Sequence, residues 1–148
     1  MKYHTQFNMA VAATLSLFLS ACASTHQIAH FPDQQKRIED PSKARIYVMR
    51  PALFGTAISI DVSDGSTPIG NTGPRSYLCW ERPPGDAILT GKAENASLLT
   101  LPVTRGNIYY VRQSIYPGVL LARNSLDLVS EKEGQETLKK CKPPQPSR

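Results

Sequence analysis

Short apolar runs separated by turn-forming residues fill this chain from residue 44 onward. Each run is too short for a typical helix, and Asp64-Gly65 between two of them is a strong signal for a tight hairpin turn. Runs of this length with turn residues between them are typical of antiparallel sheets. We predict an all-β domain, an antiparallel β-sandwich or partly open barrel of seven to eight short strands, at 44–50, 57–63, 67–70, 76–81, 86–92, 97–104, 108–115 and 125–129.

Three of these runs carry further signals. The 44–50 run is apolar on both faces, which suits a central strand, while 57–63 alternates with Ile60 and Val62 on one face. Pro102 indicates that 97–104 is an edge strand or contains a bulge. The chain has 12 Pro in 148 residues, about 8 per cent against an average of about 5 per cent, which argues against a helical bundle.

One short helix is predicted after the last strand. Ser130 and Glu133 have the spacing of a capping box, and Glu136 and Lys140 can form an i, i+4 ion pair. We expect the helix to run from about 131 to 140 and to pack through Leu138. The domain would then span 44–141, followed by a disordered, Pro-rich tail at 142–148.

The N-terminal residues have the organisation of a secretory signal. Lys2 precedes the apolar run 9–19, whose 11 residues fall short of the roughly 20 that a membrane-spanning helix needs. The run ends in Leu19-Ser20-Ala21-Cys22, which resembles the lipobox of bacterial lipoproteins. The resemblance implies removal of the signal peptide 1–21 and acylation of Cys22 with diacylglycerol and a fatty acid such as palmitate. The alternative is a plain secretory signal with a chance Cys.

The residues after Cys22 indicate where such a lipoprotein would reside. Ala23 stands where an Asp would favour retention in the inner membrane, so the resemblance favours a lipid anchor in the outer membrane, facing the periplasm. Residues 22–43 are polar, with Pro32 and Pro41, and read as a flexible tether behind the lipidated Cys. The formal charge of +5 falls to +4 when Lys2 is removed.

Cys79 and Cys141 remain after acylation of Cys22. In an oxidising compartment they can form a disulfide, worth about 4 kcal/mol by chain-entropy arithmetic for so long a loop. The alternative is two free thiols. No C-x-x-C spacing points to a redox site.

Few residues of the chain are suited to catalysis. His26 and His30 lie in the predicted tether and His4 in the signal, so the predicted domain has no His for a Ser–His or Cys–His system. No phosphate-binding Gly motif and no four-ligand zinc pattern occurs. We expect no catalytic residue, no metal and no cofactor.

Aromatic and basic residues supply the candidate binding surface. Trp80, Tyr109, Arg112 and Tyr116 could rim a ligand site, although core packing is the alternative for the aromatic residues. The dispersed Arg residues either meet an anionic envelope partner, such as lipopolysaccharide or peptidoglycan, or form local ion pairs. We expect no nucleic-acid partner, because export separates the chain from nucleic acid.

Several of these segments together resemble a known family. ARIYVMRP at 44–51, Ile69-Gly70, GPRSY at 73–77, Pro84-Gly85 and GNIYYVR at 106–112 follow in the order seen in a bacterial lipoprotein family, domain of unknown function 2846. The resemblance implies a β-sandwich-like domain with a short C-terminal helix and supplies no catalytic residues. The chain departs from the family at 73–82, where Cys79 and Trp80 stand.

These observations favour a non-enzymatic binding or scaffolding module of the cell envelope, held to the bilayer through acylated Cys22. The alternative is an inhibitor or accessory subunit of an envelope enzyme, although a charge of +4 would repel basic targets such as lysozymes. A cell-wall hydrolase is less favoured, and it would require paired carboxylates such as Asp61 and Glu81 to converge.

Overall fold

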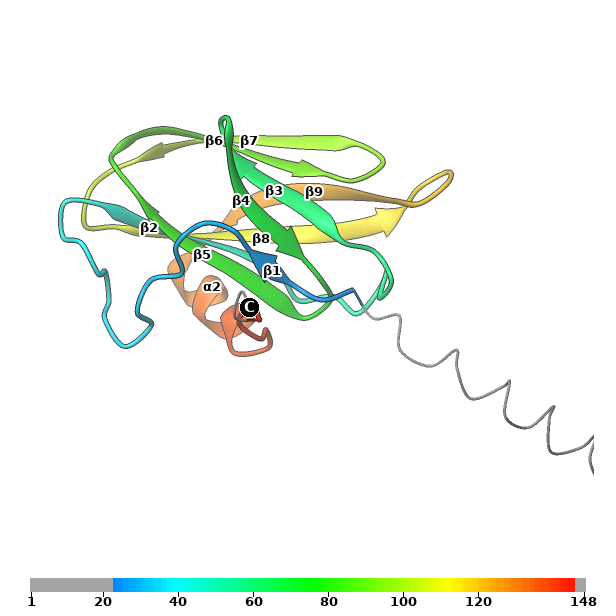
Figure 1. Ribbon diagram of the computed structural model, residues 1–148, viewed down its shortest axis with the longest axis horizontal. Coiled ribbons are helices and arrows are strands. Elements are labelled where there is room, and N and C mark those ends of the chain that lie inside the picture. The colour runs from blue at the N-terminus through cyan, green and yellow to red at the C-terminus, as the bar shows by residue number, and fades with distance from the viewer. Residues whose placement is uncertain (1–22, 146–148) are drawn as a thin grey trace, which may run out of the picture.

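The computed structural model describes residues 23–145, so the predicted signal peptide and Cys22 lie outside the described residues. The described chain forms two packed β-sheets and one helix (Figure 1). The five-stranded sheet has the order β1-β4-β3-β6-β7 and the four-stranded sheet the order β5-β2-β8-β9. The bounds are β1 His26–Gln27, β2 Ala44–Arg50, β3 Ile60–Asp64, β4 Thr67–Thr72, β5 Ser76–Arg82, β6 Gly85–Lys92, β7 Ala96–Val103, β8 Ile108–Pro117, β9 Ala122–Val129 and α2 Glu131–Leu138.

The predicted β-sandwich with a short C-terminal helix is confirmed, with two differences. Residues 23–145 contain nine strands, because β1 forms inside the predicted tether. The sheets are not purely antiparallel, since β2 and β8 pair in parallel, and they do not close into a barrel. Pro102 lies on β7, an edge strand as expected. Among the described residues, no helix has the length and apolar character needed to cross a bilayer.

Strand β2 lies between β5 and β8 in its sheet, and both of its faces are buried. Ile46 and Val48 point between the sheets, where they meet apolar side chains from both sheets, such as Leu78 and Leu89. Tyr47, on the opposite face, packs in a second cluster with residues of β5, β8 and the C-terminal segment. A strand buried on both faces requires an unbroken apolar run, which is the pattern of 44–50.

Local sequence signals also account for the β3–β4 hairpin and for the start of α2. Gly65 has φ of 58° in the two-residue turn that joins β3 to β4. Ser130 Oγ accepts a hydrogen bond from the Glu133 N–H at 3.2 Å, as predicted for the helix N-terminus. The other half of the capping box does not form, because the Glu133 carboxylate pairs with Arg112 instead. Gly134 lets α2 approach the Tyr110 ring, where a Cβ would overlap the ring.

The prediction of a flexible tether is wrong for residues 23–43, which pack on the sandwich. The Gln27 side chain donates to the Cys79 carbonyl at 2.6 Å and accepts from the Cys79 N–H at 3.0 Å, so it continues the hydrogen bonding at the edge of β5. The buried Thr25 hydroxyl accepts from the Gly73 N–H at 2.8 Å. Gln27 thus completes the open edge of β5, and Thr25 holds the loop between β4 and β5. The polar composition of this segment does not distinguish these roles from solvation.

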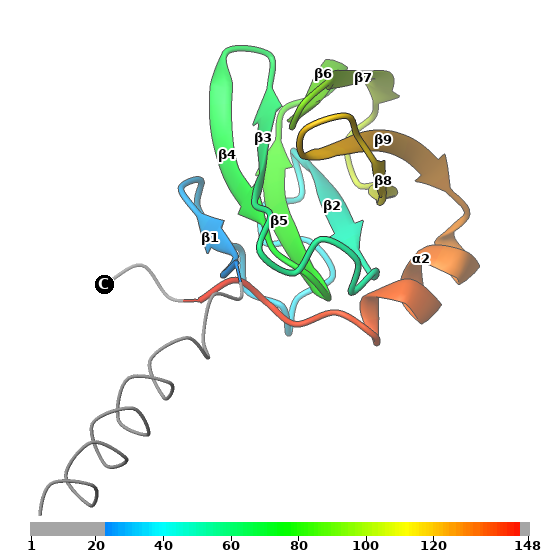
Figure 2. The same ribbon diagram turned by 90° about the vertical axis from the view of Figure 1, so that its right-hand side faces the viewer.

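Residues 142–145 of the predicted tail are also ordered against the sandwich. Lys142 forms a bridge with Ser76, and Gln145 forms one with His26. Figure 2 shows α2 and the chain that follows it passing β2 and β5 toward β1.

The structure does not contain the predicted disulfide. Cys79 and Cys141 are both free thiols, although both contact the cluster around Tyr77. Cys79 is fully buried on β5, and burial raises the pKa of its thiol to about 12. Burial also raises the pKa of Cys141 to about 11. Both thiols are therefore protonated at neutral pH and have little nucleophilic character.

Candidate functional site

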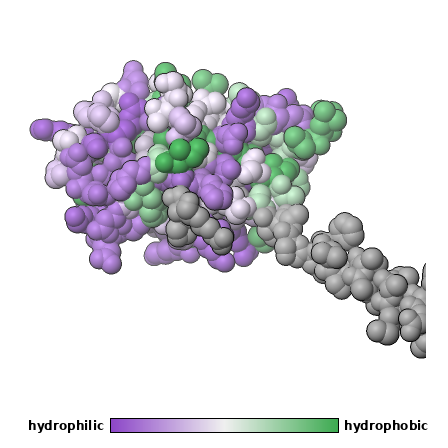
Figure 3. Space-filling model, in the orientation of Figure 1, coloured by the Kyte–Doolittle hydropathy of each residue, from purple (hydrophilic) through white to green (hydrophobic). Residues whose placement is uncertain are grey.

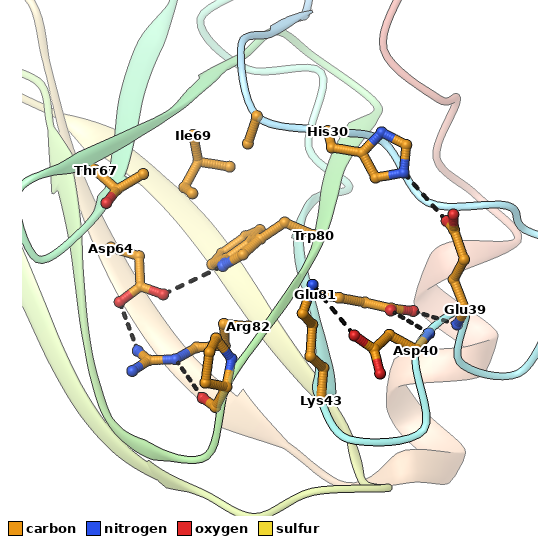
Figure 4. Close-up of a pocket in the computed structure, with 12 residues that line it drawn as sticks. His30, Glu39, Asp40, Lys43, Asp64, Thr67, Ile69, Trp80, Glu81 and Arg82 are labelled. Carbon is orange, nitrogen blue, oxygen red and sulfur yellow. Dashed lines mark hydrogen bonds and ion pairs between the residues drawn. The ribbon is translucent and has the colours of Figure 1, made fainter.

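A cleft of about 620 Å³ opens between the edge strand β5 and the part of β4 that lies beyond its short pairing with β1. Strand β4 contributes Ile69 to the floor, β5 contributes Trp80, and the packed segment 29–43 forms one wall (Figure 4). Its volume lies in the range of sites that bind small molecules. The lining residues are Ala29, His30, Glu39, Asp40, Lys43, Asp64, Thr67, Ile69, Trp80, Glu81, Arg82 and Pro83.

The Trp80 indole forms part of the cleft floor while most of the ring belongs to the core. Its indole N–H donates to Asp64 Oδ2 at 3.2 Å, and Arg82 Nη1 donates to Asp64 Oδ1 at 2.7 Å. The Asp64 and Arg82 side chains are only 11 % and 20 % exposed. Asp64 at the end of β3 therefore ties the five-stranded sheet to β5 of the other sheet and holds a charge pair beside the apolar floor.

The Glu81 carboxylate is buried and fully engaged. Its Oε1 accepts from Arg45 Nε at 3.0 Å and from Arg45 Nη2 at 2.8 Å. The backbone N–H groups of Glu39 and Asp40 donate to the same carboxylate at 2.7 and 2.9 Å. Burial alone would raise the pKa of Glu81, but these hydrogen bonds and the Arg45 charge outweigh it and hold the pKa below its usual range.

Arg45 extends this network into the wall of the cleft. Its Nη2 donates to the Asp33 carbonyl at 3.0 Å and its Nη1 to the Lys36 carbonyl at 2.9 Å. The Arg45 and Glu81 side chains are 1 % and 6 % exposed. The buried pair thus fixes the 33–43 segment on β2 and β5.

The rim of the cleft carries exposed charges of both signs. His30 Nε2 lies 3.2 Å from Glu39 Oε2, and Lys43 Nζ lies 3.4 Å from Asp40 Oδ2. A hydrogen bond from the Asp33 backbone, together with one from His30, lowers the pKa of Glu39, so that this carboxylate is ionised at neutral pH. The rim can therefore meet carboxylate and ammonium groups of a ligand at the same time.

The predicted binding surface of Trp80, Tyr109, Arg112 and Tyr116 is wrong as a single site. Only Trp80 lines the cleft. The Tyr109 hydroxyl accepts from the Thr104 N–H at 3.0 Å, and Arg112 pairs with Glu133 on the face covered by α2. Tyr116 is half exposed near the far end of β8. Alternation along one strand sends the odd- and even-numbered residues of β8 to opposite faces.

Other sequence candidates fall in different places. Asp61 lines a second pocket, opposite Lys92 on β6, and does not share the Glu81 cleft. Of the Arg residues, Arg45 and Arg50 are fully buried, which their dispersion in the sequence did not indicate. Among residues 23–145, no group of three or more His, Cys, Asp or Glu residues is placed to hold a metal ion.

Most residues of the cleft were missed by sequence reasoning. Glu39, Asp40 and Lys43 lie in the segment predicted as a tether, and no motif marks them. Asp64 was interpreted only as a turn residue. The one available signal was the unbroken apolar run of β5 followed by Glu81-Arg82, two charges at the end of a buried strand.

Comparison with known proteins identifies one relative and no family. The chain is 26 % identical over 130 residues to an uncharacterized protein of Haemophilus influenzae, an alignment that covers 85 % of this chain and 77 % of that protein. No protein-family profile matches the chain. No solved structure matches it either.

Proposed function

We propose that this chain is a lipid-anchored, non-enzymatic binding protein of the bacterial cell envelope, and that its ligand occupies the cleft between β4 and β5. The lipobox-like Leu19–Cys22 segment supports an anchor on Cys22 in the outer membrane, with the domain in the periplasm. The observation that carries the binding role is the cleft itself, with an apolar floor at Trp80 and Ile69 and a rim of both charges.

The chemistry of the cleft favours binding over catalysis. A general acid at neutral pH requires a carboxyl whose pKa is raised, whereas the pKa of Glu81 is lowered. Asp64 is held by both Arg82 and the Trp80 indole. The His30 side chain is 78 % exposed on the outer rim and contacts Glu39. These inner groups support the walls, and the exposed rim charges are left to meet a ligand.

The mixed rim favours a ligand that carries carboxylates and an ammonium group together. The peptide portions of peptidoglycan have this chemistry, and they would lie within reach of a protein anchored at the outer membrane. An apolar floor flanked by paired charges suits a short peptide, whose backbone packs on the indole edge while its end groups meet Lys43 and Glu39.

Lys43→Glu is expected to weaken binding of the full acylated protein, in detergent, to purified insoluble peptidoglycan. Reversing one rim charge replaces an attraction to ligand carboxylates by a repulsion, for which we expect about a tenfold loss of affinity in co-sedimentation. The matched control is Lys132→Glu, the same charge change at an exposed position on α2. Equal retention of both variants, or no retention of the unmodified protein, would remove peptidoglycan peptides as the ligand of this cleft.

A further inference from the structure

Two apolar loops lie at the same end of the sandwich. Strands β2 and β8 are parallel, with Met49 opposite Arg112, so the loops that follow them leave the sheet in the same direction. The loop after β2 exposes Leu53 and Phe54, which are 51 % and 52 % exposed. The tip of the β8–β9 hairpin exposes Val119, Leu120 and Leu121, which are 88 %, 87 % and 66 % exposed. We call these five residues the apolar end.

The β8–β9 hairpin projects beyond the sheet. Strand β8 continues from Arg112 to Pro117 after the last residue paired with β2, a length of about 16 Å at roughly 3.3 Å per residue. Figure 1 shows this hairpin extending past its neighbours, and Figure 3 shows apolar surface at the same end of the molecule. Soluble proteins rarely expose adjoining large apolar side chains in this way without a surface to cover them.

The hairpin tip is held in one conformation by Glu94. The Glu94 carboxylate accepts hydrogen bonds from the backbone N–H groups of Val119, Leu120 and Leu121 at 3.0, 2.9 and 2.8 Å. The Gly118 N–H donates to the Leu121 carbonyl at 3.3 Å. The backbone donors of the tip are thus satisfied from behind while its apolar side chains point outward. An apolar environment penalises unsatisfied backbone groups, so this arrangement suits insertion into lipid.

The loop after β2 is held in a similar way by the buried Arg50. Its guanidinium donates to the carbonyls of Ile58 at 2.7 Å, Gly55 at 2.8 Å and Phe54 at 3.2 Å within that loop, and to the Thr72 carbonyl at 2.9 Å. The burial of Arg50 lowers its pKa. Both apolar loops are therefore fixed by a charged group on the domain side.

The described chain begins at the apolar end. The Ala23 N–H donates to the Thr56 carbonyl in the loop after β2, at 2.7 Å. Thr25 and Gln27 are buried, so the described chain is packed on the sandwich almost from its first residue, Ala23. Adjacent Cα atoms are about 3.8 Å apart, so acyl chains on Cys22 would hold this end of the domain against the bilayer.

We propose that the apolar end inserts into the outer-membrane surface beside the lipid anchor. This inference rests on the acylation of Cys22 in the proposed function. Two exposed arginines, Arg75 and Arg123, lie near the two loops. The Arg75 backbone N–H donates to the Ala52 carbonyl in the loop after β2, and Arg123 follows the hairpin tip at the start of β9. Exposed arginines beside an inserted loop favour anionic headgroups. The domain is then docked on the bilayer in a fixed orientation.

This orientation presents the cleft to the periplasm. Strand β4 starts at Thr67 on the cleft and ends at Thr72, beside Gly73 and its contact with Ala23. The cleft and the apolar end therefore lie at opposite ends of β4, about 16 Å apart along the strand at roughly 3.3 Å per residue. Docking at the apolar end leaves the cleft open toward the cell wall.

Fluorescence quenching by lipid tests this insertion. The full acylated chain carrying Leu120→Trp is reconstituted into vesicles of phosphatidylethanolamine and phosphatidylglycerol, with or without bromine atoms on the acyl chains. The control is Leu128→Trp, which is half exposed on β9 away from the tip and shares the same buried Trp80 background. We expect brominated lipid to reduce the emission added by Leu120→Trp to about half, because interfacial insertion reaches the acyl boundary, and to leave Leu128→Trp unchanged.

The possible outcomes distinguish insertion of the apolar end from acylation of Cys22. If mass analysis of the reconstituted protein finds acyl chains and Leu120→Trp is quenched no more than Leu128→Trp, the insertion is refuted and the anchor stands. Selective quenching of Leu120→Trp on a chain without acyl groups would support insertion and refute the anchor. A chain without acyl groups in which Leu120→Trp is quenched no more than Leu128→Trp would refute both the insertion and the anchor.

Discussion

Glu81→Ala is expected to lower the free energy of unfolding by about 3–5 kcal/mol, because it leaves the buried Arg45 charge without its partner. Arg45 is 1 % exposed and donates two hydrogen bonds to the Glu81 carboxylate. The substitution also removes the acceptor for the backbone N–H groups of Glu39 and Asp40. We expect the wall of the cleft, and not only the global stability, to be affected.

Urea denaturation measures the loss of global stability in Glu81→Ala, and hydrogen exchange measures the loss of protection in the wall of the cleft. The matched control is Glu133→Ala, which breaks an ion pair whose side chains are 42 % and 45 % exposed, a change worth about 1 kcal/mol or less. Faster exchange at the Glu39 and Asp40 amides should accompany the loss of stability in Glu81→Ala alone. A Glu81→Ala protein as stable as Glu133→Ala, with protected amides, would show that the buried pair does not support the fold.

The same pair gives the stability a dependence on acid pH. The pKa of Glu81 is lowered from an ordinary value of 4.5 by the hydrogen bonds and charge described above, against the opposing effect of burial. Its contribution is therefore complete above about pH 4.5 and is lost as the pH falls through the lower pKa of the folded state. We expect the difference in stability between the unmodified protein and Glu81→Ala to narrow below that pH.

Cys22→Ser is expected to move the protein from the membrane to the soluble periplasmic fraction, lowering the membrane-to-soluble ratio by about a hundredfold or more. Two or more acyl chains anchor a protein stably, whereas the few apolar side chains of the loops bind a bilayer weakly. Cys141→Ser is the matched control, since it makes the same chemical change at a free thiol in the domain. Fractionation of cells that produce each variant provides the measurement. Equal membrane retention of the two variants would contradict an anchor on Cys22.

The sequence predicted the strands well because their signals are local. The apolar run of β2, the alternation of Ile60 and Val62 in β3 and the turn at Asp64-Gly65 each act within a few residues. The structure confirms them, although β3 spans Ile60–Asp64 and not the predicted 57–63. The parallel pairing of β2 with β8 was not predicted. It joins segments some sixty residues apart, and strand pattern alone does not select a partner.

The candidate site was predicted poorly because polar residues look alike in sequence whether they are solvated or paired. Gln27 completes the edge of β5, and Arg45 and Arg50 are buried with backbone carbonyls as partners. Nothing in the spacing of these residues distinguishes them from surface residues. For the same reason residues 23–43, interpreted as a tether, were not expected to form a wall of the cleft.

Mass analysis of the protein purified from bacterial membranes tests whether Cys22 is the acylated first residue of the mature chain. We expect a chain that lacks residues 1–21 and begins at Cys22 with acyl chains on its sulfur and amino group. A chain that still begins at Met1, or one cleaved elsewhere and carrying no acyl group, would contradict this expectation.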